Sequence, residues 1–310
     1  MTPKEPVILP NFICIGAQKT GTTTLYHILK NHPEITVSHP RKETKYFYRD
    51  EEYKLGLGFY SGFFSYDTPR KAIGEFDPDY LFFDYIPERI YKDLGTEMKF
   101  IVMLRNPIDR AYSQYLMSVK KGFEKLSFEE AIANEQNRKL SGSKKDWNHF
   151  SYISRGYYDQ QLERYFKFYD KKNFLIINYE NEFKENLPEV VKKICGFIGV
   201  SDVDLKTNII ANEATEAKYL SLTKFVKKGP VNNLLSLIVP NKEWRKQLRR
   251  AILRWNQKRV EIVPLSNEFR IYLYQNYFSD SINNLEKILN TDLTIWKEAK
   301  TIVPEKSASA

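Results

Sequence analysis

A lysine and several threonines surround two glycines near the start of the chain, a combination suited to holding an anion. The segment reads Gly16-Ala17-Gln18-Lys19-Thr20-Gly21-Thr22-Thr23-Thr24. It follows an apolar run and precedes Leu25, Ile28 and Leu29 at helical spacing, so the pattern predicts a strand, a loop and a helix. The N–H groups and dipole of such a helix start favour a phosphate-like group, to which Lys19 adds a charge and the threonines add hydroxyl donors.

The order of these residues differs from that of a nucleotide-triphosphate loop, which reads G-x-x-x-x-G-K-[ST]. Gly16 and Gly21 have the right spacing, but Thr22 stands where the lysine of that loop belongs, and Lys19 lies three residues earlier. A kinase or another NTP-using enzyme is therefore disfavoured and stays as an alternative interpretation. A second alternative is a non-catalytic basic module that binds anions.

A second candidate anion site follows the apolar run 99–104, which ends at Arg105. Pro107 suits the first turn of a helix, and Ser113 falls two helical turns after Asn106, so its hydroxyl can face the end of the strand. Open α/β sheets bind ligands at this edge. A magnesium-dependent phosphotransferase usually has an aspartate there, so an arginine indicates a second anion, and we expect no metal.

Together these motifs resemble those of a known family. Residues 16–23 are similar to the 5′-phosphosulfate loop of sulfotransferases that use PAPS (3′-phosphoadenosine 5′-phosphosulfate), and residues 105–113 are similar to their 3′-phosphate motif. Lys42-Glu43-Thr44-Lys45-Tyr46-Phe47 resembles the K-E-x-[HK]-[FY]-F segment of the heparan-sulfate-type glycan sulfotransferases and their bacterial relatives. Segments 156–162 and 285–296 also fit this family.

The resemblance implies transfer of a sulfuryl group from PAPS to a hydroxyl or an amine without a metal, leaving adenosine 3′,5′-bisphosphate (PAP). It implies that Lys19 neutralises the leaving 5′-phosphate and that Glu43 is the catalytic base. Glu75 is either a structural partner or a substitute base, and His39 and His149 are lesser candidates for the base. The residues expected to hold PAPS are Gly16, Gln18, Lys19, Thr20, Gly21, Thr22, Thr23, Thr24, Arg105, Ser113 and Lys218. The residues expected around the acceptor are Lys42, Glu75, Trp147, His149 and Tyr152.

The chain departs from the family pattern at residues 74–80, where relatives often carry G-E-K-[ST]-P-x-Y. Phe76 replaces the lysine and Asp77 replaces the hydroxyl, so we expect a different geometry around the acceptor. The acceptor is either a glycan or glycolipid, as the resemblance implies, or a small cytoplasmic metabolite. A Lys-Gly-Arg-type loop near the 3′-phosphate is not plainly present; Lys218 and Lys227-Lys228-Gly229 are the candidates.

Composition bounds the class of protein. The 310 residues include 15% aromatics, enough for a full core. Cys14 and Cys195 fall in predicted core elements and form no disulfide framework, which indicates a reducing compartment and two packing residues. Neither a secretory signal nor a membrane span is predicted, so we expect a cytoplasmic enzyme of bacterial type.

The net charge of +9 fits an anionic cofactor, and no nucleic-acid module is recognisable, so we expect no nucleic-acid partner. Much of the charge lies in residues 242–259, where Trp244, Leu248, Ile252 and Trp255 mark one stripe of a helix. We favour a surface helix with a solvated basic face. The alternative is a docking face for an acidic glycan, a protein partner or a membrane surface.

The elements that must position these residues alternate along the chain. Strands are predicted at 11–15, 35–37, 71–75, 99–104 and 173–179. Helices are predicted at 22–31, 87–94, 107–121, 127–139, 157–169, 187–198 and 268–289. This alternation predicts an α/β fold with a P-loop-like central parallel sheet and helices on both faces.

The predicted domain organisation is simple. Residues 1–10 are a mobile lead-in, 11–300 form a single domain with a helical C-terminal appendage from about residue 205, and 301–310 form a loose tail. Long connections in a compact domain are often functional, so segments 38–70 and 138–154 are expected to wall the acceptor pocket.

Overall fold

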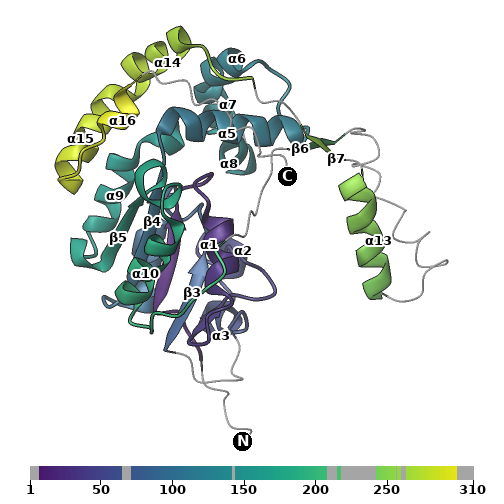
Figure 1. Ribbon diagram of the computed structural model, residues 1–310, viewed down its shortest axis with the longest axis vertical. Coiled ribbons are helices and arrows are strands. Elements are labelled where there is room, and N and C mark those ends of the chain that lie inside the picture. Colours follow the sequence, from purple (N-terminus) through teal and green to yellow (C-terminus); the bar gives the residue numbers. More distant parts are fainter. Residues whose placement is uncertain are drawn as a thin grey trace, which may run out of the picture.

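A five-stranded parallel sheet lies at the centre of the molecule (Figure 1), with strand order β2-β3-β1-β4-β5. This computed structural model describes residues 7–64, 71–141, 144–207, 215–217, 242–255, 257–259 and 263–298. The strands of the sheet are β1 (Phe12–Gly16), β2 (Ile35–Val37), β3 (Ala72–Phe76), β4 (Lys99–Leu104) and β5 (Phe174–Asn178). The predicted α/β fold is confirmed.

Helices cover both faces of the sheet (Figure 1). Those that precede β4 are α1 (Thr22–Leu29), α2 (Asp50–Tyr53), α3 (Gly56–Ser61) and α4 (Ile86–Leu94). Between β4 and β5 lie α5 (Pro107–Lys120), α6 (Phe128–Ala133), α7 (Glu135–Ser141), α8 (Lys144–Phe150) and α9 (Tyr158–Phe166). After β5 come α10 (Leu187–Ile198), α13 (Lys242–Trp255), α14 (Asn267–Leu273), α15 (Ser279–Leu289) and α16 (Thr294–Lys297).

The apolar runs of the strands reflect burial on both faces of the sheet. Along β1, Ile13 and Ile15 point into one core, while Phe12 and Cys14 point into the other. Parallel strands that are covered by helices on both sides are apolar at every position, as this run is. Cys195 lies in the same core as Cys14, and both thiols are buried and free.

The strand order determines where the candidate residues meet. β1 lies between β3 and β4, and all three strands are parallel. The segments that follow β1, β3 and β4 therefore leave the sheet at the same edge, which is the ligand-binding edge of open α/β sheets. These segments begin at residues 17, 77 and 105.

Several helices differ from the sequence-based prediction. The helix predicted at 127–139 is two helices, because α6 ends at Ala133 with Asn134 as its C-cap, and α7 begins at Glu135. The helix predicted at 268–289 contains a π-helical turn, Tyr274–Phe278, between α14 and α15. The short helices α2, α3 and α8 were not predicted, and they lie in the two connections that were expected to be loops.

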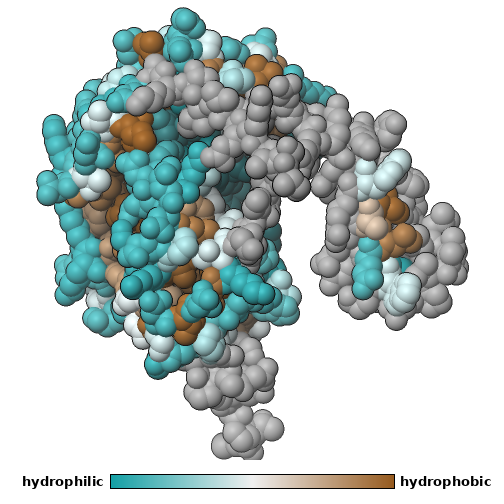
Figure 2. Space-filling model, viewed as in Figure 1, coloured by the Kyte–Doolittle hydropathy of each residue, from teal (hydrophilic) through white to brown (hydrophobic). Residues whose placement is uncertain are grey.

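The region after residue 205 was predicted to be helical. It contains helices and, in addition, two short strands. Short strands β6 (Thr215–Ala217) and β7 (Gln257–Arg259) pair antiparallel, so the helix predicted within 242–259 ends at Trp255. Figure 1 shows α13 standing apart from the sheet. Apolar residues are visible on it in Figure 2, and Trp244 and Trp255 are 68% and 64% exposed. No helix in the described ranges has the length and apolar character needed to cross a bilayer.

Candidate active site

The loop between β1 and α1 is held in an unusual backbone conformation. Lys19 has φ +74° and Gly21 has φ +87°, both in the left-handed region. At Gly21 a side chain is also excluded by packing, because a Cβ atom there would lie 2.6 Å from Cε1 of Phe183. The second glycine of the predicted anion loop is therefore required by the backbone and by a close neighbour.

The start of α1 offers backbone donors to an anion. Gly21 is the N-cap residue and has no side chain to bind the N–H groups of the first turn, which contains no acidic residue. The Thr20 hydroxyl is used differently from the prediction, since it donates to the carbonyl of Ala17 at 2.7 Å and so stabilises the loop. Buried Oε1 of Gln18 has no hydrogen-bond partner among the described residues.

Lys19 contributes a partly buried ammonium group to this loop. Its Nζ lies 3.9 Å from Sδ of Met117 on α5. Burial lowers the pKa of Lys19 to about 8, and the nearby positive charges of Arg105, Lys121, Lys120 and Arg110 act in the same direction. A group that is surrounded by cations in this way is stabilised in its charged form by a bound anion.

Arg105 joins the two predicted anion sites. It follows β4, and its Nη1 donates a hydrogen bond to the backbone carbonyl of Lys19 at 3.1 Å. The guanidinium carbon also lies 4.9 Å from the centre of the Tyr179 ring. Its buried Nε has no partner within the described part of the chain, so the side chain keeps donor capacity.

Helix α5 carries Ser113 toward the same region. Asn106 caps this helix by accepting a hydrogen bond from the N–H of Ile108 at 3.0 Å. Ser113 lies one helical turn before Met117, the residue that contacts the Lys19 ammonium group. Residues four apart share a helix face, so Ser113 lies on the face of α5 that is turned toward the anion loop.

Glu43 is held between two lysines close to the anion loop. Nζ of Lys42 lies 3.5 Å from Oε1 of Glu43, and Nζ of Lys45 lies 3.8 Å from Oε2. The same Lys42 ammonium donates to the hydroxyl of Thr23, on the first turn of α1, at 3.1 Å. The predicted base, with 35% of its side chain exposed, is thus linked to the start of α1 through one lysine.

Glu75 lies inside the protein, which fits the structural role expected for it and not a side chain that faces an acceptor. It is fully buried, and hydroxyl groups of Thr44, Tyr60 and Tyr80 all donate to its carboxylate. Burial raises the pKa of Glu75 to about 7, and these donors act in the opposite direction. Phe76, the next residue, points to the other face of the sheet and packs against Phe12.

A buried charge cluster beside Glu43 was not predicted from the sequence. Asp79 is contacted by Nζ of Lys45 at 3.2 Å and by the Arg155 guanidinium at 3.0 Å. Although burial opposes ionisation, these two cations hold the pKa of Asp79 below its usual range. Burial and the Asp79 charge raise the pKa of neighbouring Asp77 well above its usual range. The departure from the family pattern at 74–80 was the only signal of this cluster.

The remaining acceptor-side candidates differ in burial. Tyr152 is fully buried and donates to Glu124 at 2.9 Å, so it belongs to the core and does not face an acceptor. Trp147 and His149 are half-buried on α8. The Trp147 ring lies 5.6 Å from that of Phe82, between ring centres.

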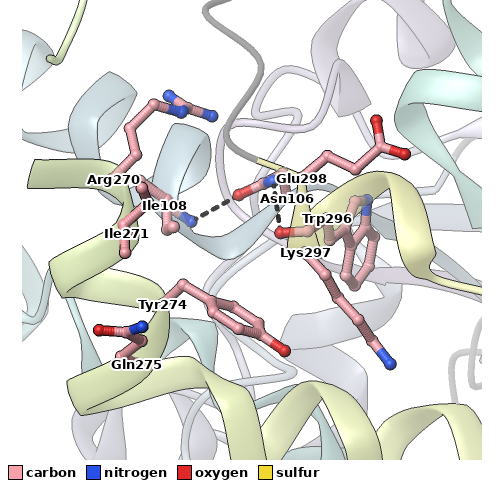
Figure 3. Close-up of a pocket in the computed structure, with 9 residues that line it drawn as sticks. All are labelled: Asn106, Ile108, Arg270, Ile271, Tyr274, Gln275, Trp296, Lys297 and Glu298. Carbon is pink, nitrogen blue, oxygen red and sulfur yellow. Dashed lines mark hydrogen bonds between the residues drawn. The ribbon is translucent and has the colours of Figure 1, made fainter. Parts of the chain in front are cut away.

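A cavity of about 190 Å³ opens beside Asn106 (Figure 3). In this view the side chain of Asn106 accepts a hydrogen bond from the N–H of Ile108 and donates one to the carbonyl of Trp296. The cations at this cavity, Arg270 and Lys297, are paired with carboxylates of Asp109 and Glu286. Of the residues predicted for the cofactor or the acceptor, none that the structure describes lines this cavity.

Two of the candidates for the 3′-phosphate fall on residues that the structure does not describe. They are Lys218 and the segment Lys227-Lys228-Gly229.

Comparison with known proteins gives a consistent result. A family model described as "Sulfotransferase domain" matches residues 9–258. The chain is 29% identical over 185 residues to the heparan sulfate glucosamine 3-O-sulfotransferase 5 of Mus musculus, covering 59% of this chain and 51% of that enzyme. It is 28% identical over 211 residues to the bifunctional heparan sulfate N-deacetylase/N-sulfotransferase 2 of Homo sapiens, covering 62% of this chain and 22% of that enzyme. This chain thus spans about half the length of the first relative and less of the second.

A solved structure matches over nearly the whole chain. The sulfotransferase from Alicyclobacillus acidocaldarius superposes with a TM-score of 0.65 and 27% sequence identity. The match covers 94% of this chain and 100% of that one. The likeness therefore includes the sheet and the helices around it.

Proposed function

Because the chain belongs to the sulfotransferase domain family, we propose that it transfers a sulfuryl group from PAPS to a hydroxyl or amine acceptor. The observation that carries this proposal is the joined anion site at the edge of the sheet. Nη1 of Arg105, after β4, lies 3.1 Å from the backbone carbonyl oxygen of Lys19, in the loop after β1. The positive charge of Arg105 is close enough to lower the pKa of Lys19, so two cations lie together at the edge where open sheets bind ligands.

The residues present fit a donor with two anionic groups. The phosphosulfate would be held by Lys19, the N–H groups at the start of α1 and the hydroxyls of Thr22, Thr23 and Thr24. The 3′-phosphate would be held by Arg105 and Ser113. The buried Nε of Arg105, which lacks a partner among the described residues, supports the need for an external acceptor here.

Stabilisation of charge and proton transfer are the two tasks of the protein in this reaction. PAPS would supply the sulfuryl group: the bond between its sulfur and the 5′-phosphate oxygen would break as the bond to the acceptor oxygen or nitrogen forms, and PAP would leave, with negative charge spread over the sulfuryl oxygens and the 5′-phosphate. The Lys19 ammonium and the donors of the α1 start act on this negative charge. The Glu43 carboxylate accepts the proton of the acceptor, and its contacts with Lys42 and Lys45 fix its orientation.

We propose a glycan, a glycolipid or a small metabolite as the acceptor. Similarity to two heparan sulfate enzymes supports a sugar hydroxyl or amine. The buried position of Phe76 and the charge cluster around Asp79 support an acceptor site that differs from the sites of those relatives.

A mass-spectrometric acceptor screen tests this proposal. The protein is incubated with PAPS and a panel of sugars, glycolipids and small alcohols and amines, and products are identified by a mass gain of one sulfate group. We expect at least one product, and we expect Lys19→Ala to abolish it. Phosphate transfer from magnesium-ATP in place of sulfate transfer would overturn the proposal in favour of a kinase.

A further inference from the structure

Glu75 is a buried carboxylate that has no task in the proposed reaction. Its Oε1 accepts hydrogen bonds from the backbone N–H of Thr44 at 3.2 Å, from the Thr44 hydroxyl and from the Tyr80 hydroxyl at 3.0 Å. Oε2 accepts a hydrogen bond from the Tyr60 hydroxyl at 2.5 Å. This carboxylate is fully buried and accepts four hydrogen bonds, which fix its position. It therefore cannot itself reach the proton of an acceptor.

Thr44 is the residue through which this network reaches the candidate active site. Both its N–H and its hydroxyl bind the same oxygen of Glu75. The Thr44 hydroxyl oxygen also accepts from the N–H of Tyr46 at 3.1 Å, and the Tyr80 hydroxyl accepts from the N–H of Phe47 at 3.3 Å. All four N–H groups of residues 44–47 are thus hydrogen-bonded: three within this network, and that of Lys45 to Oδ2 of Asp77 at 3.2 Å.

The residues just before Thr44 carry the charged groups that face the anion loop. Glu43 is its immediate neighbour, and Lys42 contacts both the Glu43 carboxylate and the hydroxyl of Thr23. A continuous set of bonds and contacts thus runs from the buried carboxylate of Glu75 to the first turn of α1. β3 lies inside the sheet between β2 and β1, so this set starts from a rigid element.

We propose that Glu75 is a positioning residue that fixes the Glu43 carboxylate beside the anion loop by holding Thr44. This inference rests on the proposed function, because Glu43 is a base only in that reaction. The physical reason is distance: a base must lie within hydrogen-bond reach of the proton it accepts. A displacement of about 1 Å can cost about 100-fold in rate.

Substitutions at Thr44 test the proposal while leaving Glu75 itself in place. Thr44→Val keeps the shape and the N–H donor but removes the hydroxyl, whereas Thr44→Ser keeps the hydroxyl. Ser281→Ala is the matched control, because it also removes a buried hydroxyl that donates to a carboxylate. Ser281 lies on α15, and its hydroxyl donates to Asp159 on α9 at 2.5 Å. The three variants and the wild type are compared in melting temperature, PAP binding, turnover of the acceptor found by the screen, and hydrogen exchange of residues 42–48.

Thr44→Val should lower kcat about 10-fold to 100-fold and leave the KM for PAPS and the PAP-induced melting shift unchanged. Amide exchange in residues 42–48 should become faster in this variant alone. Thr44→Ser should restore both readouts, and Ser281→Ala should lower only the melting temperature.

Two results would overturn the proposal: unchanged exchange of residues 42–48 in Thr44→Val, or an equal loss of kcat in Ser281→Ala. A wild-type protein that neither binds PAP nor transfers sulfate would instead reject the proposed function. The exchange data are independent of turnover, so they still decide in that case whether the Glu75–Thr44 contact holds the segment.

Discussion

Arg105 donates a hydrogen bond to the backbone carbonyl of Lys19, with 3.1 Å between Nη1 and the oxygen. The residue expected to bind one anion therefore also holds the loop expected to bind the other. A loss of Arg105 would remove a charge and also free the backbone of a residue that has a left-handed conformation, φ +74°. The two anion sites thus form one unit, and ligands that carry both charges should be strongly preferred.

Nucleotide selectivity is the first consequence. PAP at about 100 times its dissociation constant should stabilise the protein by about 2.7 kcal/mol through mass action. AMP lacks the 3′-phosphate that Arg105 is expected to bind, so at the same concentration it should give a much smaller shift. Thermal unfolding with PAP, AMP and ATP measures the difference. Equal shifts for PAP and AMP would mean that no 3′-phosphate is recognised.

The lowered pKa of Lys19 predicts a pH-dependent affinity. Since burial and neighbouring cations lower this pKa from 10.5 to about 8, the unliganded protein loses the ammonium proton as the pH rises above about 8. A bound anion restores the charged form, so PAP binding should take up a proton and weaken with rising pH in this range. Calorimetric titration in buffers of different ionisation enthalpy measures this uptake.

Lys19→Arg provides the control for this titration, because a guanidinium group stays protonated throughout. The variant should bind PAP without uptake of a proton between about pH 8 and 10. For the unliganded wild type, the folded pKa lies below the unfolded value of 10.5. Burial of this charge therefore lowers the free energy of unfolding by its full amount below about pH 8, and this destabilisation disappears as the pH rises toward 10.5.

The role of Glu43 as the base is tested by Glu43→Gln, which keeps the shape and removes the basicity. We expect kcat to fall by about 10²-fold to 10⁴-fold, because no carboxylate remains to accept the acceptor's proton. The PAP-induced shift in melting temperature should stay as in the wild type. Near-normal turnover in this variant would reject the assignment and leave His39 and His149 as the candidates for the base.

The packing of Gly21 against Phe183 predicts a cost for any side chain in the anion loop. Gly21→Ala should lower the free energy of unfolding by about 1–3 kcal/mol, because the residue has φ +87° and the new Cβ would lie 2.6 Å from the Phe183 ring. Gly58→Ala on α3 is the control, since a Cβ there meets nothing within 4 Å. Urea unfolding should show little change or a small gain for the control; equal losses would contradict the packing argument.

The sheet and the anion loop could be predicted because their signals are local. An apolar run such as residues 12–15 specifies a buried strand, and glycine and lysine spacing specifies the loop after it. The helix breaks were missed because they depend on single residues. Asn134, for example, ends α6 within a pattern that otherwise reads as one helix.

The inner part of the site could not be predicted, because its contacts join distant segments. The carboxylate of Glu75 accepts hydrogen bonds from Tyr60 and Thr44, which lie 15 and 31 residues away in the sequence. Alternation along β3 places Glu75 and Phe76 on opposite faces of the sheet, but only the packed structure shows which face is turned toward the candidate base. The family pattern, read alone, leaves Glu75 as either a structural partner or a substitute base.

The two buried cysteines make the native protein suitable for site-specific labelling. Cys14 and Cys195 are the only thiols in the chain, and burial raises the pKa of Cys14 to about 12 and that of Cys195 above its usual range. Maleimide reagents react with exposed thiolates, so the folded protein should be almost inert to them. A single cysteine introduced at exposed Trp255 could then carry a fluorophore without removal of the native pair, and later reaction of Cys14 would report unfolding of the sheet.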